Sequence, residues 1–120
     1  MQGRVVLVST DLAIRRIIPT VLSQTGYHVD LLSPMEALGF VCQHEADVVI
    51  LDLGPDQAAC FVRLAGRLKW RGPTIILSAG TRADLEMAEL SADSFLRKPI
   101  DPEEIVTALG ELTSAAAAGG

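Results

Sequence analysis

Five short strand-like runs alternate along this chain with segments of helical periodicity. The runs cover residues 4–8, 28–32, 47–51, 74–77 and 93–97, and most are apolar and rich in β-branched residues. Continuous apolar runs of this length are typical of strands buried on both faces of a parallel sheet. Parallel neighbours need a crossover between them, and that crossover is usually a helix. The alternation therefore predicts a single α/β domain: a doubly wound, five-stranded parallel sheet covered on both faces.

Five helices are predicted between and after these strands. They cover about residues 11–25, 33–44, 58–70, 81–90 and 101–112. The second has the clearest start, because Ser33 is a cap, a proline follows it and Glu36 can reach back to the cap. Gly54-Pro55 is interpreted as a loop before the third helix. Residues 114–120 are small and uncharged, which predicts a linker or terminal tail after a domain over residues 1–113.

Composition and charge exclude several classes of protein. The 120 residues carry 15 acidic and 10 basic side chains, a net charge of −5, which argues against direct nucleic-acid binding through bulk charge. No apolar run approaches the about 18–20 residues of a membrane span, and the N-terminus lacks the layout of a signal peptide. Cys42 and Cys60 are too few for a disulfide scaffold or a zinc site, and predict reduced thiols. We expect a cytoplasmic protein.

Three chemically useful side chains follow predicted strands. Asp52 follows the third strand, Ser78 the fourth and Lys98 the fifth. In open parallel sheets, ligands bind beyond the carboxyl ends of the strands, so these side chains are expected to meet there. A carboxylate can attack phosphorus to form an acyl phosphate, while an ammonium and a hydroxyl stabilise the phosphoryl oxygens. The pattern predicts a phosphoryl-transfer site, to which a divalent cation is normally added.

This order of Asp, Ser-Ala and Lys-Pro resembles the receiver domain of bacterial response regulators. The resemblance covers residues 4–112 and rests on three segments, residues 48–53, 75–79 and 92–99. It implies a flavodoxin-like sheet with the strand order 2-1-3-4-5. It also implies that Asp52 is the phosphoacceptor, Ser78 the switch hydroxyl and Lys98 the phosphate-binding lysine.

The resemblance implies further features and partners. The peptide bond before Pro99 would be cis, and Phe95 would be the aromatic residue whose rotamer follows phosphorylation. A histidine kinase or phosphotransfer protein would supply the phosphoryl group. An output domain, an effector protein or a second copy of the chain would bind the face formed by the fourth helix, fifth strand and fifth helix. We expect a phosphorelay signalling module and not an enzyme with turnover.

The metal side of the predicted site departs from the family. Receiver domains end their first strand on an acidic pair that holds Mg²⁺, and here those positions are Ser9 and Thr10. The remaining candidate ligands are Asp52, Asp11 and the backbone carbonyl of Gly54. Mg²⁺ prefers oxygen ligands in octahedral geometry, and lost carboxylates weaken its binding. We expect weak Mg²⁺ binding, and weakened or absent Mg²⁺-dependent phosphorylation.

Other interpretations stay open at the level of sequence. A receiver fold can act as a protein-interaction module without phosphorylation, a pseudo-receiver. A flavodoxin-like cofactor binder could use Ser9-Thr10 to start a phosphate loop, but Asp11 places an acid where the phosphate would lie. Asp11 can be a helix cap, Ser78 a loop cap and Phe95 a core residue. The sequence leaves undecided whether the loop after Asp52 is shortened or only rewritten.

Overall fold

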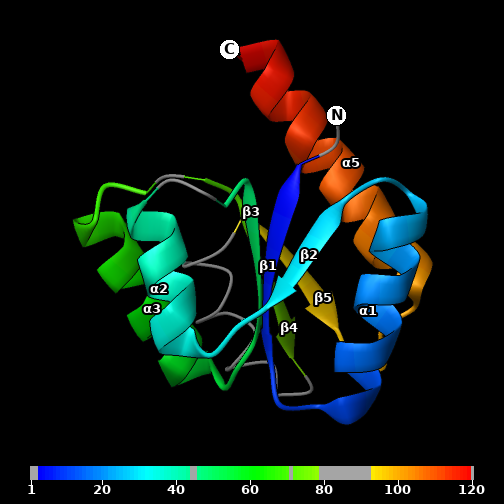
Figure 1. Cartoon of the computed structure of the whole chain (residues 1–120), viewed down its shortest axis with the longest axis horizontal. Coiled ribbons are helices and arrows are strands. Elements are labelled where there is room, and N and C mark those ends of the chain that lie inside the picture. The colour runs from blue at the N-terminus through cyan, green and yellow to red at the C-terminus, as the bar shows by residue number, and fades with distance from the viewer. Residues whose placement is uncertain (1–2, 44–45, 71, 79–92, 120) are drawn as a thin grey trace.

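The computed structural model describes residues 3–43, 46–70, 72–78 and 93–119. Its centre is one five-stranded parallel sheet (Figure 1). The strands are β1 (Arg4–Ser9), β2 (His28–Leu31), β3 (Val48–Asp52), β4 (Thr74–Ser78) and β5 (Ser94–Arg97). Their order is β2-β1-β3-β4-β5, and every neighbouring pair is parallel. The predicted fold class and strand order are confirmed.

Helices cover both faces of the sheet. The described helices are α1 (Leu12–Gln24), α2 (Pro34–Cys42), α3 (Pro55–Arg67) and α5 (Pro102–Gly119). Figure 1 shows α2 and α3 on one side of the sheet and α1 and α5 on the other. The fourth predicted helix, at residues 81–90, lies outside the described residues. The layering is that of a doubly wound α/β domain.

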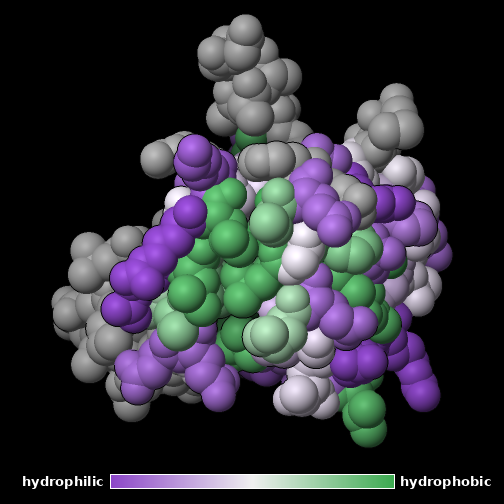
Figure 2. Space-filling model, turned by 60° about the vertical axis from the view of Figure 1, so that its left-hand side comes forward, coloured by the Kyte–Doolittle hydropathy of each residue, from purple (hydrophilic) through white to green (hydrophobic). Residues whose placement is uncertain are grey.

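The core consists of two apolar clusters, one on each face of the sheet. In β1, Val6 and Val8 belong to the cluster under α2 and α3, whereas Val5 and Leu7 belong to the cluster under α1 and α5. All four side chains are at most 2% exposed. Side chains of a strand point alternately to the two faces, so a strand covered on both faces must be apolar throughout. Figure 2, with the α2 and α3 side turned forward, shows apolar side chains reaching the surface there between polar ones.

The start of α3 corrects one prediction. Gly54 and Pro55 were expected in a loop, but Gly54 is the N-cap of α3 and Pro55 its first residue. Proline is well suited to the first helical position, because its fixed φ is helical and its missing N–H has no partner there in any case. The Gly54 carbonyl accepts a hydrogen bond of 2.9 Å from the Ala58 N–H. The helix therefore begins three residues after Asp52, and little loop is left between them.

Two other helix boundaries were predicted from the sequence, one correctly and one not. The capping box at the start of α2 is confirmed, with Ser33 and Glu36 each accepting a backbone N–H of the other. The end of α5 was predicted near Leu112, and this prediction is wrong, because the helix continues to Gly119. The added residues are mostly alanine, the strongest helix former. In Figure 1, α5 extends beyond the sheet; the role of residues 114–120 as a linker stays a prediction.

Candidate functional site

The register of the sheet brings Ser9 and Asp52 side by side. They are paired residues at the carboxyl ends of β1 and β3, which are neighbouring parallel strands. Ser78 ends β4, the next strand along the sheet, and Lys98 follows β5. The backbone N–H of Lys98 donates to the Ser78 carbonyl at 2.8 Å. The residues predicted for phosphoryl transfer therefore lie at one edge of the sheet, at the bottom of Figure 1.

Both carboxylate oxygens of Asp52 are engaged by neighbouring side chains. The Ser9 hydroxyl donates to Oδ2 at 2.5 Å, and the Lys98 ammonium lies 2.6 Å from Oδ1. The Asp52 side chain is 9% exposed and that of Lys98 23% exposed. A charged hydrogen bond of this length is among the stronger polar contacts in proteins. The negative charge of Asp52 is thus compensated by groups of the chain itself.

Asp11 connects helix α1 to the same site. Its Oδ1 accepts the backbone N–H groups of Ala13 at 2.9 Å and Ile14 at 3.3 Å, so Asp11 is the N-cap of α1. Its Oδ2 lies 3.5 Å from the Lys98 ammonium. The hydrogen bond from Ile14 is the largest of the effects that hold the pKa of Asp11 below its ordinary value, with smaller contributions from Ala13 and Lys98. Asp11 therefore acts as a helix cap and as a second partner of Lys98.

Replacing Asp11 by asparagine should change how stability depends on pH. Asparagine caps a helix about as well as aspartate but does not titrate and does not attract Lys98. Because the folded pKa of Asp11 is lowered from 3.8, its contribution is present above that ordinary value and is lost as the pH falls through the lowered one. In urea unfolding, the difference between the parent and Asp11→Asn should shrink with acidification. A difference that stays constant down to low pH contradicts this role.

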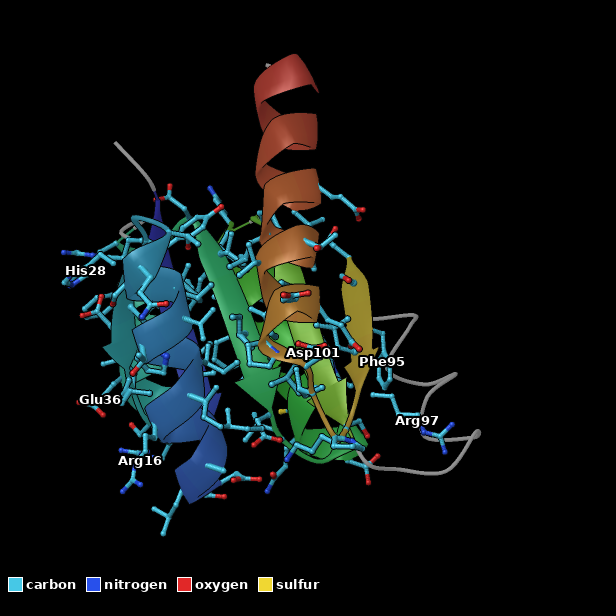
Figure 3. All side chains as sticks on the ribbon, turned by 90° about the vertical axis from the view of Figure 1, so that its right-hand side faces the viewer. Arg16, His28, Glu36, Phe95, Arg97 and Asp101 are labelled. Carbon is cyan, nitrogen blue, oxygen red and sulfur yellow. The ribbon has the colours of Figure 1, made fainter. Side chains whose placement is uncertain are left out.

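The structure describes the lysine–proline peptide bond and the surroundings of Phe95. The peptide bond between Lys98 and Pro99 is cis. Phe95 lies on the edge strand β5 (Figure 3). Its side chain is partly buried and packs against the core cluster on the α2 and α3 side. The fourth helix, which would complete the predicted signalling face, lies outside the described residues. The switch roles of Ser78 and Phe95 stay predictions.

The described residues do not fit a Mg²⁺ site well. Asp52 and Asp11 lie on either side of the Lys98 ammonium, a cation already in contact with both carboxylates. The Gly54 carbonyl accepts a hydrogen bond within α3. The described residues contain no group of three or more His, Cys, Asp or Glu side chains that could hold a metal ion. Ser9 supplies a neutral hydroxyl that already donates to Asp52, so the described edge offers Mg²⁺ little negative charge.

The sequence did not predict two contacts of the site. Ser9 was identified only as the residue at the position of a metal-binding acid, whereas its hydroxyl donates to Asp52 directly. The guanidinium of Arg15 donates to the Ser9 carbonyl at 2.9 Å. Arg15 was not among the residues predicted for the site. One signal was available: Arg15 lies one helical turn after Asp11, on the same side of α1 as the strand end.

Comparisons with known proteins agree with the fold and identify the family of the chain. Residues 5–110 match the family of the response regulator receiver domain. The chain belongs to this family. It is 34% identical over 110 residues to the transcriptional regulatory protein KdpE of Mycobacterium tuberculosis H37Rv, a match covering 88% of this chain and 48% of KdpE. It is 32% identical over 113 residues to the DNA-binding transcriptional regulator NtrC of a Bradyrhizobium species, covering 90% of this chain and 24% of NtrC. The chain thus spans only a quarter to a half of these relatives.

Solved structures show the same fold. A receiver domain from Methanospirillum hungatei JF-1 matches with a TM-score of 0.84 and 17% identity, covering 100% of both chains. The receiver domain of the sensor histidine kinase PA1611 from Pseudomonas aeruginosa PAO1, solved with a coordinated magnesium ion, has a TM-score of 0.76 and 22% identity. That match covers 93% of this chain and 98% of the other. A receiver domain of this fold can therefore hold Mg²⁺ in its active-site cleft.

The structure bears on two remaining sequence hypotheses. A phosphate loop at Ser9-Thr10 would use free backbone N–H groups at the start of α1, but Asp11 already binds those of Ala13 and Ile14. This contact and the family membership disfavour a flavodoxin-like cofactor site. Among the described residues, no helix has the length and apolar character to span a membrane.

Proposed function

We propose that this chain is the receiver module of a phosphorelay, with Asp52 as phosphoacceptor and with weakened dependence on Mg²⁺. The observation that carries the proposal is the pair formed by Asp52 and the Lys98 ammonium, 2.6 Å apart at the carboxyl edge of the sheet. A nucleophilic carboxylate beside a fixed cation is what transfer of an anionic phosphoryl group requires. Family membership supports the same role.

The proposed chemistry uses these side chains in distinct roles. A carboxylate oxygen of Asp52 attacks phosphorus, a P–O or P–N bond to the donor breaks, and an acyl phosphate forms on Asp52. Lys98 offsets the charge of the phosphoryl oxygens, and the hydroxyl of Ser78 donates a hydrogen bond to one of them. Each carboxylate oxygen of Asp52 already holds one contact, with Ser9 or with Lys98. These contacts lower the nucleophilicity of the carboxylate, which favours slow phosphorylation.

The weak use of Mg²⁺ is part of the proposal. It is supported by the neutral Ser9 and Thr10 at the positions of the acidic pair, and by the helical hydrogen bond of the Gly54 carbonyl. Asp11 would have to give up its contacts with the first turn of α1 and with Lys98 to bind a metal. In this interpretation the Lys98 ammonium offsets the charge of Asp52 as a bound cation would, and the Ser9 hydroxyl adds a hydrogen bond to the other carboxylate oxygen.

The proposed partners follow from the phosphorelay role. The phosphoryl group would come from a histidine kinase or a phosphotransfer protein. The signal would pass through the face around β5 and α5, near Phe95, to an output domain, an effector protein or a second copy of the chain. We propose a cytoplasmic signalling module without enzymatic turnover.

Replacing Asp52 by asparagine should remove all phosphoryl labelling. Asparagine has nearly the same shape and keeps a carbonyl oxygen for Ser9, but its amide does not attack phosphorus. The parent chain, incubated for long times with acetyl phosphate, should gain one phosphoryl group by intact-mass analysis. Asp56→Asn is a matched control, because Asp56 is an exposed acid in the first turn of α3. Labelling that persists in Asp52→Asn, or disappears in Asp56→Asn, contradicts the assignment.

A further inference from the structure

A cavity of about 440 Å³ lies beside the Asp52 site. It is lined by residues of the β1–α1, β2–α2 and β3–α3 connections, at the bottom of Figure 1. In open α/β sheets, ligands bind at this edge, near the point where the strand order reverses. Small-molecule sites typically have volumes of about 300–1,000 Å³ and combine apolar walls with a few polar groups. The cavity therefore has the position and the size of a ligand site.

Arg15 supplies a fixed positive charge to this cavity. Its Nη1 donates to the Ser9 carbonyl at 2.9 Å, which anchors the guanidinium against the end of β1. Within the described part of the chain, the Arg15 side chain has no other hydrogen bond and no ion pair. A guanidinium carries five N–H donors in a planar fork, so most of them remain for a ligand.

Glu36 supplies a fixed negative charge to the same cavity. Its Oε1 accepts the backbone N–H of Ser33 at 3.0 Å, and this bond is the main cause of its lowered pKa. The side chain is therefore a carboxylate at neutral pH. In the ranges that the structure describes, Glu36 and Arg15 form no ion pair with each other, although both line the cavity. Two residues of opposite charge, each held by a hydrogen bond with the backbone, thus line one cavity.

We propose that this cavity binds a small zwitterion with an apolar body, of which an apolar α-amino acid is the simplest example. The ligand carboxylate binds the guanidinium of Arg15, and its ammonium binds Glu36. Its apolar part contacts Leu31 and Leu53 in the cavity wall. A simple anion is repelled by Glu36 and a simple cation by Arg15, whereas a zwitterion satisfies both charges. The site goes beyond the role of Asp52 and does not depend on it.

The ligand test compares molecules that differ in one charge. The full chain is titrated with L-leucine, N-acetyl-L-leucine and L-leucinamide, and backbone amide shifts are followed by NMR. L-leucine should give saturable shifts of Thr10, Leu31 and Leu53 at millimolar concentrations. Each analogue lacks one charge and should bind about tenfold more weakly or worse, since it leaves one protein charge unpaired. Absence of saturable shifts with L-leucine, or equal binding of the analogues, overturns the proposal.

Two charge-removing variants and one control locate the site. Arg15→Gln and Glu36→Gln should each weaken L-leucine binding about tenfold or more, because each removes one ion pair with the ligand. Glutamine can replace glutamate in a capping box, so Glu36→Gln keeps the start of α2. If Arg15→Gln fails to fold, binding of L-leucine by Glu36→Gln alone tests the proposal. Arg16→Gln is the matched control, because Arg16 extends from α1 into open space (Figure 3) and does not line the cavity. Weakening by Arg16→Gln equal to that by Arg15→Gln, or unchanged binding in Glu36→Gln, overturns the proposal.

Discussion

The double variant Ser9→Asp with Thr10→Asp should bind Mg²⁺ at least about tenfold more tightly than the parent chain, a change of about 1.4 kcal/mol. The two new carboxylates add negative charge at the end of β1, next to Asp52. Carboxylate oxygens are the protein ligands that Mg²⁺ prefers. The substitution also removes the Ser9 hydroxyl that now donates to Asp52, which leaves Oδ2 available to a cation. Affinity is measured by NMR titration with Mg²⁺.

Labelling of the same variant separates two causes of weak phosphorylation. If only the acidic pair is missing, the rate of labelling by acetyl phosphate rises together with the affinity for Mg²⁺. If the early start of α3 also matters, the affinity rises and the labelling does not. Ser23→Asp with Gln24→Glu adds the same charge at the exposed far end of α1 and should change neither quantity. An unchanged Mg²⁺ affinity in Ser9→Asp with Thr10→Asp would falsify the account of the metal side.

Ile50→Ala should lower the free energy of unfolding by about 3 kcal/mol, because it leaves a cavity in a closely packed core. Ile50 is 0% exposed, in the middle of β3, in the cluster under α1 and α5. Domains of this size are stable by only about 5–15 kcal/mol, so the loss is a large part of the total. Ile17→Ala is the matched control, since Ile17 is 44% exposed on α1 and should lose less than about 1 kcal/mol. Equal losses in urea unfolding would show that Ile50 does not lie in the core.

The α/β fold class was predictable from the sequence because the three central strands, β1, β3 and β4, are buried on both faces. Such strands must be apolar, so a run such as residues 5–8 could not be mistaken for an amphipathic helix. The capping box of Ser33 and Glu36 was predictable for the same kind of reason, since it uses only residues within one helical turn. Sequence patterns that are compatible with only one local structure were thus interpreted correctly.

The start of α3 and the end of α5 were not predictable from local sequence patterns. Gly54-Pro55 favours a turn and a helix start about equally, and tertiary packing decides between them. The alanines after Leu112 are small and uncharged, which was interpreted as a linker, yet alanine is also the strongest helix former. In both cases the same short segment is compatible with a helix and with a loop.

The contacts of the site depend on the register between neighbouring strands, which the sequence patterns do not predict. That Asp52, Ser78 and Lys98 meet at one edge follows from the order of the strands. That Ser9 lies directly opposite Asp52 and donates to it depends on the pairing of β1 with β3, residue by residue. Arg15 reaches the Ser9 carbonyl from another element, so its role also required the three-dimensional structure.

The most direct test of the central claim is the Mg²⁺ dependence of Asp52 phosphorylation in the unaltered chain. The backbone amide of Asp11, which donates to the Ser9 hydroxyl, reports on the metal side of the site. Trp70 precedes β4 and bonds to Ala46 at the opposite edge of the sheet, so it serves as the reference signal. We expect little shift at millimolar Mg²⁺, and slow labelling of Asp52 at similar rates with Mg²⁺ and with a chelator. Tight Mg²⁺ binding with rapid, chelator-sensitive labelling would contradict the account.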